Sequence, residues 1–297
     1  MDTYIKKLED YRKSNGEPLS EKSKELYIRT IDSMVKKNGL DWRIFKIEQF
    51  VKGFTTSTKL VYINSVINYL TVMDYTEKQL WAYKEYKKDL ENQKSEEPQM
   101  SEKKTSNLVS WDDILNWRDL VCAENNNKET YTTAMLETLL RLYTTYPRRN
   151  ELGTLHYKEL EGENTELDKD TNYLLNKEGD LYLRLVDYKT AGKYGEKVFQ
   201  ITDPDLIICL NDYLEKNEWR EHLFNSPKFP DKPLTTTNLT KTLQRSSKKH
   251  LGKMVSTDRI RKAYASQNKE VIEKLEADAD LLGHSVATNL KYYNVVK

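Results

Sequence analysis

The sequence has few of the residues that build metal, redox or nucleotide chemistry. It contains two cysteines, Cys122 and Cys209, which are far apart and lack the Cys-x-x-Cys spacing of zinc and redox motifs. Its four histidines do not cluster with these cysteines, so the sequence indicates no metal site and no bound cofactor. With only 10 glycines and neither a P-loop nor a glycine-rich dinucleotide loop, nucleotide-driven chemistry is not expected.

Long apolar runs are also missing. No stretch approaches the roughly 18 apolar residues that mark a membrane span, and the N-terminal residues lack the apolar run of a signal peptide. Cysteines without a pairing pattern are typical of a reducing compartment. We therefore expect a soluble, intracellular protein with no membrane partner.

Charges of both signs are abundant and nearly balanced. The chain has 48 Lys and Arg against 47 Asp and Glu, a formal net charge of +1. A net charge is a sum, so acidic surface elsewhere can offset a basic groove. Residues 1–95 hold 18 basic against 14 acidic residues, and the rest of the chain holds 30 against 33. This asymmetry favours an anionic partner for the first part of the chain.

The first 90 residues are predicted to be all helical. Apolar side chains fall at helical spacing after Ser20, which is placed to cap a helix, and again after Thr58. Gly39 and Gly53 lie at positions where helices should end. Residues 1–90 therefore form the first predicted domain.

Residues 91–107 are charged and contain almost no apolar side chains, which predicts a flexible linker between two domains. The second domain, residues 108–297, is predicted to be mostly α-helical with a small antiparallel β-sheet. Two segments alternate with period two, residues 181–186 and 197–201, and are expected to form strands joined through residues 190–195. Helices are expected at 111–121, 130–145, 203–217, 236–250 and 258–276.

Candidate phosphate-binding residues lie in two arginine-containing segments. Arg148 follows Pro147 just after an apolar helix, where its guanidinium can clamp a phosphate through two parallel hydrogen bonds. Glu151 is placed to hold that guanidinium from behind, and a surface arginine pair with a local ion pair is the alternative. Arg261 lies beside an apolar helix face, where it either points into a cleft or is solvated.

Two further candidates lie close to the end of the sequence. His284 follows Gly283, whose conformational freedom permits a tight turn, and Tyr293 comes nine residues later. Ser285 is placed to cap a helix that runs towards Tyr293. Taken alone, His284 also fits a buried, hydrogen-bonded histidine that carries no chemistry.

In this order, the segments resemble the catalytic domain of the tyrosine recombinases, the phage-integrase family. The stretch Tyr-Thr-Thr-Tyr-Pro-Arg-Arg-Asn-Glu-Leu is similar to that family's first arginine box, and Arg-Lys-Ala-Tyr-Ala-Ser is similar to its second. Leu-Gly-His-Ser with a tyrosine nine residues later is close to its most recognisable motif. The resemblance covers residues 108–297, and residues 1–90 are similar to the family's core-binding domain by position and helical character only.

The resemblance implies a role for each candidate residue. Tyr293 would attack the scissile DNA phosphate and form a 3′-phosphotyrosyl link. Arg148 and Arg261 would bind the non-bridging oxygens and stabilise the charge that develops in the transition state. His284 would donate to the same phosphate or assist proton transfer from the tyrosine.

The resemblance also implies that a lysine between the two predicted strands protonates the leaving 5′ oxygen. Lys189 is the first choice because it is expected to end the first strand, and Lys193 is the alternative because it lies on the turn. Neither metal nor ATP would be needed, because the phosphotyrosine keeps the energy of the broken bond. The implied partner is double-stranded DNA, held in a two-domain clamp, with a homo-tetramer acting on two DNA sites.

The chain departs from the family pattern at several positions. Asp258 stands where the family usually has a histidine, so either Asp258 is a supporting residue or Thr257 supplies the hydrogen bond. Lys262 replaces another frequent histidine, and only four residues follow Tyr293, whereas many members extend further. Tyr292 is an adjacent tyrosine, although the spacing of nine favours Tyr293 as the nucleophile.

Other classes of protein fit parts of this pattern. A type IB topoisomerase uses the same phosphotyrosine chemistry as a monomer, although the Leu-Gly-His-Ser box favours a recombinase. Asp258 favours a DNA-binding protein with a decayed active site. A helical protein-interaction module is a further alternative, but it would require the three motifs to occur in this order by chance. No acidic motif supports a metal-dependent transposase. The composition, rich in lysine and asparagine, is similar to that of viral or mobile-element integrases, which would place the protein in a host's cytoplasm or nucleus.

Overall fold

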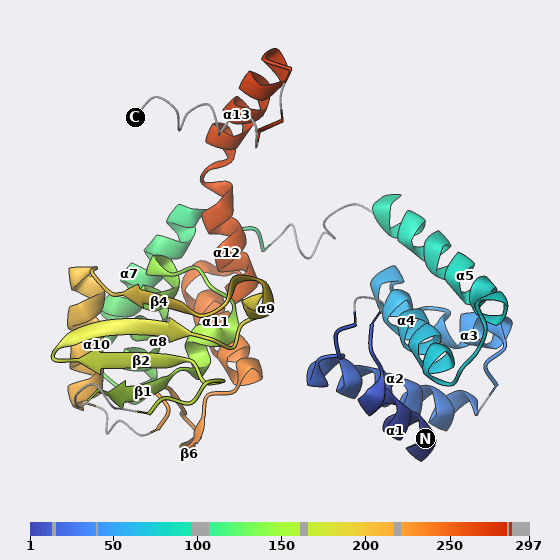
Figure 1. Ribbon diagram of the computed structural model, residues 1–297. Helices are drawn as coiled ribbons and strands as arrows, with labels where there is room; N and C mark the ends of the chain where they lie inside the picture. The colour runs from blue at the N-terminus through green and yellow to red at the C-terminus, as the bar shows by residue number, and fades with distance from the viewer. Residues whose placement is uncertain are drawn as a thin grey trace. The chain divides into compact units, whose positions relative to one another are not determined.

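The computed structural model describes residues 1–13, 16–39, 41–96, 107–160, 166–216, 221–283 and 285–286. The chain divides into two compact units, Met1–Gln99 and Met100–Lys297, which are described separately (Figure 1). The division falls within the segment that the sequence assigns to a linker. Most of that segment, residues 97–106, lies outside the described residues.

Unit 1 is built from helices, as its apolar spacing predicts. Buried side chains from these helices, among them Tyr4, Ile31, Ile63 and Leu80, pack into one hydrophobic core. The helices are α1 (Asp2–Asp10), α2 (Glu21–Asn38), α3 (Ile44–Val51), α4 (Thr56–Val72) and α5 (Glu77–Glu96).

The predicted helix boundaries in unit 1 are confirmed at the expected caps. Ser20 caps α2, because its side chain accepts a hydrogen bond from the Ser23 backbone N–H at 3.3 Å. Gly39 and Gly53 follow α2 and α3 with φ values of 66° and 91°, which glycine adopts without strain. The predicted linker begins too early, since α5 continues to Glu96. The last residues of α5 are mainly Glu, Gln and Lys, which favour helix without needing an apolar partner.

Unit 2 combines helices with a small sheet. Four of the five predicted helices are confirmed, but the expected helix over 258–276 is two helices that meet at Gln267 and Asn268. Asparagine competes for backbone hydrogen bonds and favours helix ends, and Val271 beyond the break is 60% exposed, so the apolar face does not continue. The elements are α7 (Trp111–Asn127), α8 (Tyr131–Thr145), the 3₁₀ helix η1 (Asn150–Thr154), α9 (Ala191–Tyr194), α10 (Pro204–Lys216), α11 (Thr236–Leu251), α12 (Thr257–Ser266) and α13 (Lys269–Leu281).

The four-stranded sheet of unit 2 is mixed, so the prediction of an antiparallel sheet is wrong in part. The two predicted strands, β3 (Asp180–Leu185) and β4 (Lys197–Gln200), do pair antiparallel. The sequence analysis missed β2 (Tyr173–Lys177), which pairs antiparallel with β3, and β1 (His156–Glu159), which pairs parallel with β2. β1 is only four residues long and β2 begins with three consecutive buried residues, so neither shows a clear period of two.

A second, two-stranded sheet lies apart from the first. It is an antiparallel hairpin of β5 (Asn225–Ser226) and β6 (Phe229–Pro233), and every residue of β6 is exposed. The chain then turns directly into α11. This hairpin also has no counterpart among the predicted strands.

Helix α8 lies in the core of unit 2. Its side chains Leu139, Leu140 and Tyr143 are fully buried, and they share one hydrophobic cluster with α7, α10, α11 and the four-stranded sheet. Trp117 of α7 is equally buried, and its indole N–H donates to the Ser246 hydroxyl of α11 at 3.0 Å. This packing fixes the end of α8, from which the chain continues to Arg148.

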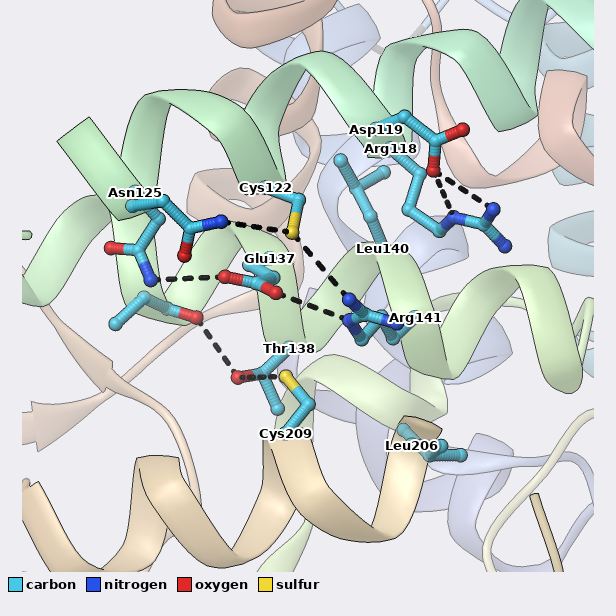
Figure 2. Close-up of polar contacts among 12 residues, drawn as sticks. Arg118, Asp119, Cys122, Asn125, Glu137, Thr138, Leu140, Arg141, Leu206 and Cys209 are labelled. Atoms are coloured by element: carbon cyan, nitrogen blue, oxygen red, sulfur yellow. Dashed lines mark hydrogen bonds and ion pairs between the residues drawn. The ribbon is translucent and has the colours of Figure 1, made fainter. Parts of the chain in front are cut away.

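A buried polar cluster joins α7 to α8 (Figure 2). Glu137 is 8% exposed, and its carboxylate accepts hydrogen bonds from Arg141 Nε at 3.1 Å and from Asn125 Nδ2 at 2.9 Å. Arg141 Nη2 also donates to the Cys122 sulfur at 3.5 Å. A buried carboxylate without partners would be strongly destabilising, so these contacts fix how the two helices pack. Cys122 and Cys209 are both free thiols.

Candidate functional site

Arg148 lies on the loop between α8 and η1, and two side chains hold its guanidinium. Its Cζ lies 4.9 Å from the centroid of the Tyr188 ring, and its Nε lies 3.4 Å from Glu151 Oε1. The predicted ion pair with Glu151 is therefore confirmed, whereas the contact with Tyr188 was not predicted. Within the described residues, the terminal nitrogens of Arg148 make no hydrogen bond. They remain available to an anion.

The Nε atom of Arg148 has a different environment from the terminal nitrogens. It is buried, and its ion pair with Glu151 does not have hydrogen-bond geometry within the described part of the chain. An unpaired buried donor is costly, and the charge of the nearby Glu151 carboxylate offsets part of that cost. Through its terminal nitrogens, the Arg148 guanidinium can bind a phosphate or a carboxylate.

Tyrosines near Arg148 are packing residues. Tyr143 is fully buried beneath the loop, and burial, followed by the negative charge of Glu151, holds its pKa well above the usual range. Burial and the nearby Asp203 carboxylate also raise the pKa of Tyr146. Both phenols are therefore held in the protonated form.

The connection between β3 and β4 contains a lysine next in sequence to Tyr188, the residue that contacts Arg148. Tyr188, whose ring lies against the Arg148 guanidinium, donates its hydroxyl to the Gly195 carbonyl at 2.6 Å and so closes this connection. Lys189 is the next residue and is exposed. The expectation that Lys189 ends the first strand is wrong, because β3 ends at Leu185 and Lys189 lies in the following turn.

Lys193 lies on the short helix α9 in the same connection. It is exposed, and its Nζ lies 5.2 Å from the centroid of the Tyr194 ring. Both candidate lysines therefore lie in the β3–β4 connection, and Lys189 is the one next in sequence to Tyr188, which contacts Arg148. The choice between them stays a prediction.

The start of α12 is hydrogen-bonded to the Arg148 loop. The Thr257 hydroxyl donates to Asn150 Oδ1 at 2.7 Å, and Thr257 is 5% exposed. Arg261 is one turn further along α12 and therefore lies on the same side of the helix as Thr257. Arg261 is half-buried and makes no hydrogen bond or ion pair with any described residue. The first arginine box is thus bonded directly to the start of α12, the helix that carries Arg261.

Asp258 faces a different direction from Thr257. It forms an ion pair with Lys262 at 2.9 Å, and both side chains are largely exposed. Successive helix residues differ by about 100°, so Thr257 can point to the loop while Asp258 points to water. Thr257 is thus tied to the first arginine box, and whether Thr257 or Asp258 takes over the role of the family's histidine stays a prediction.

One contact of α12 was not anticipated from the sequence. Arg259 Nη1 donates to the Asn107 carbonyl at 2.7 Å, and Asn107 Oδ1 accepts from the Met254 backbone N–H at 2.6 Å. These bonds attach the first described residue of unit 2 to the region of α12. No pattern in the sequence pairs residues so far apart.

The last motif of the sequence lies largely outside the described residues. Gly283 has φ 66°, so the predicted tight turn after α13 is confirmed. His284, Tyr292 and Tyr293 lie outside the described part of the chain. Their roles remain those that the resemblance implies.

Neither a metal site nor a membrane span is found among the described residues. They contain no group of three or more His, Cys, Asp or Glu side chains that could hold a metal ion. None of the helices in the described ranges has the length and apolar character needed to cross a membrane. No protein-family model, curated protein or solved structure matches this chain.

Proposed function

We propose that the protein is a site-specific tyrosine recombinase that cuts and rejoins double-stranded DNA. One observation carries the proposal beyond the sequence motifs. The first arginine box contacts the β3–β4 connection through Arg148 and Tyr188, and through Asn150 and Thr257 it contacts the start of α12, the helix that carries the second box. Three segments that are distant in sequence are thereby assembled around one loop.

The assembled side chains suit a pentacovalent phosphate. Arg148 and Arg261 each present a guanidinium without a carboxylate hydrogen bond, and such groups bind phosphate oxygens through charge-assisted hydrogen bonds. Two of them facing one phosphate would stabilise the negative charge that grows on the equatorial oxygens. Lys189 follows Tyr188 and is exposed, so it can reach a leaving group on the same phosphate.

In the proposed reaction, the Tyr293 oxygen attacks the scissile phosphorus while the bond from phosphorus to the 5′ oxygen breaks. The tyrosine proton passes to His284 or water, and Lys189 gives a proton to the departing 5′ oxygen. The product is a 3′-phosphotyrosyl enzyme and a free 5′-hydroxyl. Attack by a 5′-hydroxyl from another strand reverses these steps, so the number of phosphodiester bonds is conserved. Four protomers on two DNA sites would complete strand exchange.

Covalent trapping tests this proposal. The full chain is incubated in EDTA with nicked DNA duplexes that cover candidate target sequences, then denatured, digested and mapped by mass spectrometry. A nucleotide adduct on Tyr293 that disappears in Tyr293→Phe and persists in Tyr292→Phe is the expected result. An intact DNA complex with no adduct on any tyrosine would instead support the decayed, DNA-binding protein.

A matched pair of arginine variants tests the site itself. Arg148→Ala should lower the adduct-forming rate by about 10²–10³, as for the loss of one donor to a developing charge. Arg149→Ala removes the same charge from the neighbouring position and should leave the rate within a few-fold. Equal effects of both variants would contradict a specific role for Arg148. Products that are relaxed circles without exchanged strands would identify a topoisomerase.

A further inference from the structure

A basic hollow lies between the β5–β6 hairpin and α11, apart from the residues of the site described above. Its volume is about 330 Å³, and Lys228, Phe229, Lys241 and Arg245 are among the residues that line it. Lys241 and Arg245 are four residues apart on α11, so they lie on one face of the helix. All four of these side chains are exposed.

The charge around this hollow is strongly positive. Residues 225–252 contain six Lys and Arg against a single Asp, although the whole chain has a net charge of only +1. Within the described residues, Lys228, Lys232, Lys241 and Arg245 form no ion pair. Other lysines of unit 2 do have carboxylate partners, including Lys216, Lys249, Lys253 and Lys262. The cations of the hollow are therefore available to an external anion.

The hairpin presents an aromatic ring between two of these cations. Phe229 is 51% exposed, and Lys228 Nζ and Lys232 Nζ lie 5.2 Å and 5.7 Å from its ring centroid. An exposed aromatic ring among cations is a common feature of surfaces that bind nucleic acids, where the ring packs on a base or sugar. A buried or protein-bound phenylalanine would not need two lysines beside it.

The hairpin is held rigidly enough to act as a binding element. Its base is fixed to α8, because the Tyr131 hydroxyl accepts from the Asn225 N–H at 2.8 Å and donates to the Asn225 carbonyl at 3.0 Å. Three prolines, Pro227, Pro230 and Pro233, restrict its backbone. A two-stranded ribbon of this kind fits the major groove of B-DNA.

We propose that the β5–β6 hairpin and the exposed face of α11 bind the backbone of double-stranded DNA outside the phosphate that is cut. Lys228, Lys241 and Arg245 contact phosphates, and Phe229 makes an uncharged contact with a sugar or base. The proposal rests on the proposed function in that DNA is the substrate. It adds a second, non-catalytic contact that holds the duplex while the arginine site acts.

The salt dependence of DNA binding tests the charged contacts. For the full chain, the dissociation constant on a duplex is measured between 50 and 200 mM salt by fluorescence anisotropy. The double variant Lys241→Gln, Arg245→Gln should bind about tenfold more weakly and lower the slope of log K against log salt by about 1.8, since each phosphate contact contributes about 0.9. The control double variant Lys216→Gln, Lys253→Gln removes the same charge from lysines that already have carboxylate partners, and its slope should be unchanged.

The ring is tested separately from the charges. Phe229→Ala should weaken binding about fivefold with an unchanged salt slope, because base and sugar packing releases no counterions. A wild-type slope in the Lys241, Arg245 variant would overturn the proposal, as would an equal loss of slope in the control variant. Equal competition by polyglutamate and by DNA, weakened alike in the variant, would also overturn it and indicate an acidic protein partner.

Failure here is distinguishable from failure of the proposed function. A Tyr293 adduct in the wild type, together with unchanged binding in the Lys241, Arg245 variant, rejects the hairpin contact and keeps the recombinase. A reduced slope without any tyrosine adduct keeps the hairpin contact and rejects the cutting reaction.

Discussion

The hydrogen bond between Thr257 and Asn150 gives a quantitative test of how the two arginine boxes are joined. Thr257→Val keeps the size of the side chain and removes only the hydroxyl that donates to Asn150 Oδ1. A neutral hydrogen bond contributes about 1 kcal/mol net to folding. Because Asn150 is half-buried, water can replace part of the lost bond, so we expect a loss of about 1 kcal/mol and not the full cost of a buried unpaired group.

A double-mutant cycle isolates this contact from other effects. Thr257→Val, Asn150→Ala and the double variant are unfolded thermally, and a loss of about 1 kcal/mol corresponds to roughly 2–4 °C in Tm for a domain of this size. The two substitutions should not be additive, with a coupling energy of about 1 kcal/mol. Thr240→Val is a matched control, because the Thr240 hydroxyl bonds only to the Thr236 carbonyl of its own helix.

The same variants report on function through a single-turnover cleavage assay. If the bond positions Arg261 relative to Arg148, Thr257→Val should slow adduct formation about tenfold at a temperature where the protein is fully folded. Additive stability effects would refute the hydrogen bond. A clear coupling energy with an unchanged cleavage rate would refute its role in positioning the two arginines.

Three other predictions follow from contacts in unit 2. Tyr188→Leu should slow cleavage and lower the free energy of unfolding by about 1 kcal/mol, because Arg148 loses the aromatic ring that it packs against. Tyr188→Phe keeps the ring and should lose less than half as much stability. Single-turnover cleavage rates and Tm values compare the two variants. Gly153→Ala places a Cβ 2.4 Å from Leu239 Cδ2, so chemical denaturation should show a loss of about 1–3 kcal/mol, and no loss would contradict this close approach of η1 to α11. Burial raises the pKa of Cys209 to about 11, so its alkylation at pH 8, followed by peptide mass spectrometry, should be about a hundredfold slower than for an ordinary thiol. The raised pKa means that the folded state holds the Cys209 proton more tightly than the unfolded state does. The resulting contribution to the free energy of unfolding is full below about pH 9 and is lost as pH rises towards 11.

Local patterns predicted most of the helices but not how the sheet is paired. Ser20 and Gly39 act through neighbouring backbone groups, so their effect can be recognised from a few residues. The pairing of β1 with β2 is parallel and crosses a connection of more than ten residues, which no local period records. For this reason the antiparallel β3–β4 pair was found and the parallel pair was missed.

The candidate site shows the same limit. Glu151 was assigned to Arg148 from its spacing of three residues, and the ion pair is present. Tyr188 is forty positions from Arg148, so only the fold reveals that its ring supports the guanidinium. Between Thr257 and Asp258 the sequence offered two possibilities, because the direction of each side chain depends on where the Arg148 loop lies around α12.

Helix α8 connects the two places where we propose that DNA is bound. Tyr131 in its first turn holds the base of the β5–β6 hairpin, and Arg148 follows its last turn. A helix of 15 residues is about 22 Å long at 1.5 Å per residue, and α8 is buried along most of that length. On B-DNA, at 3.4 Å per base pair, this length corresponds to about six or seven base pairs. The length of DNA that the protein protects beside a cut would then be set by α8, and inserting one helical turn into α8 would lengthen the protected DNA.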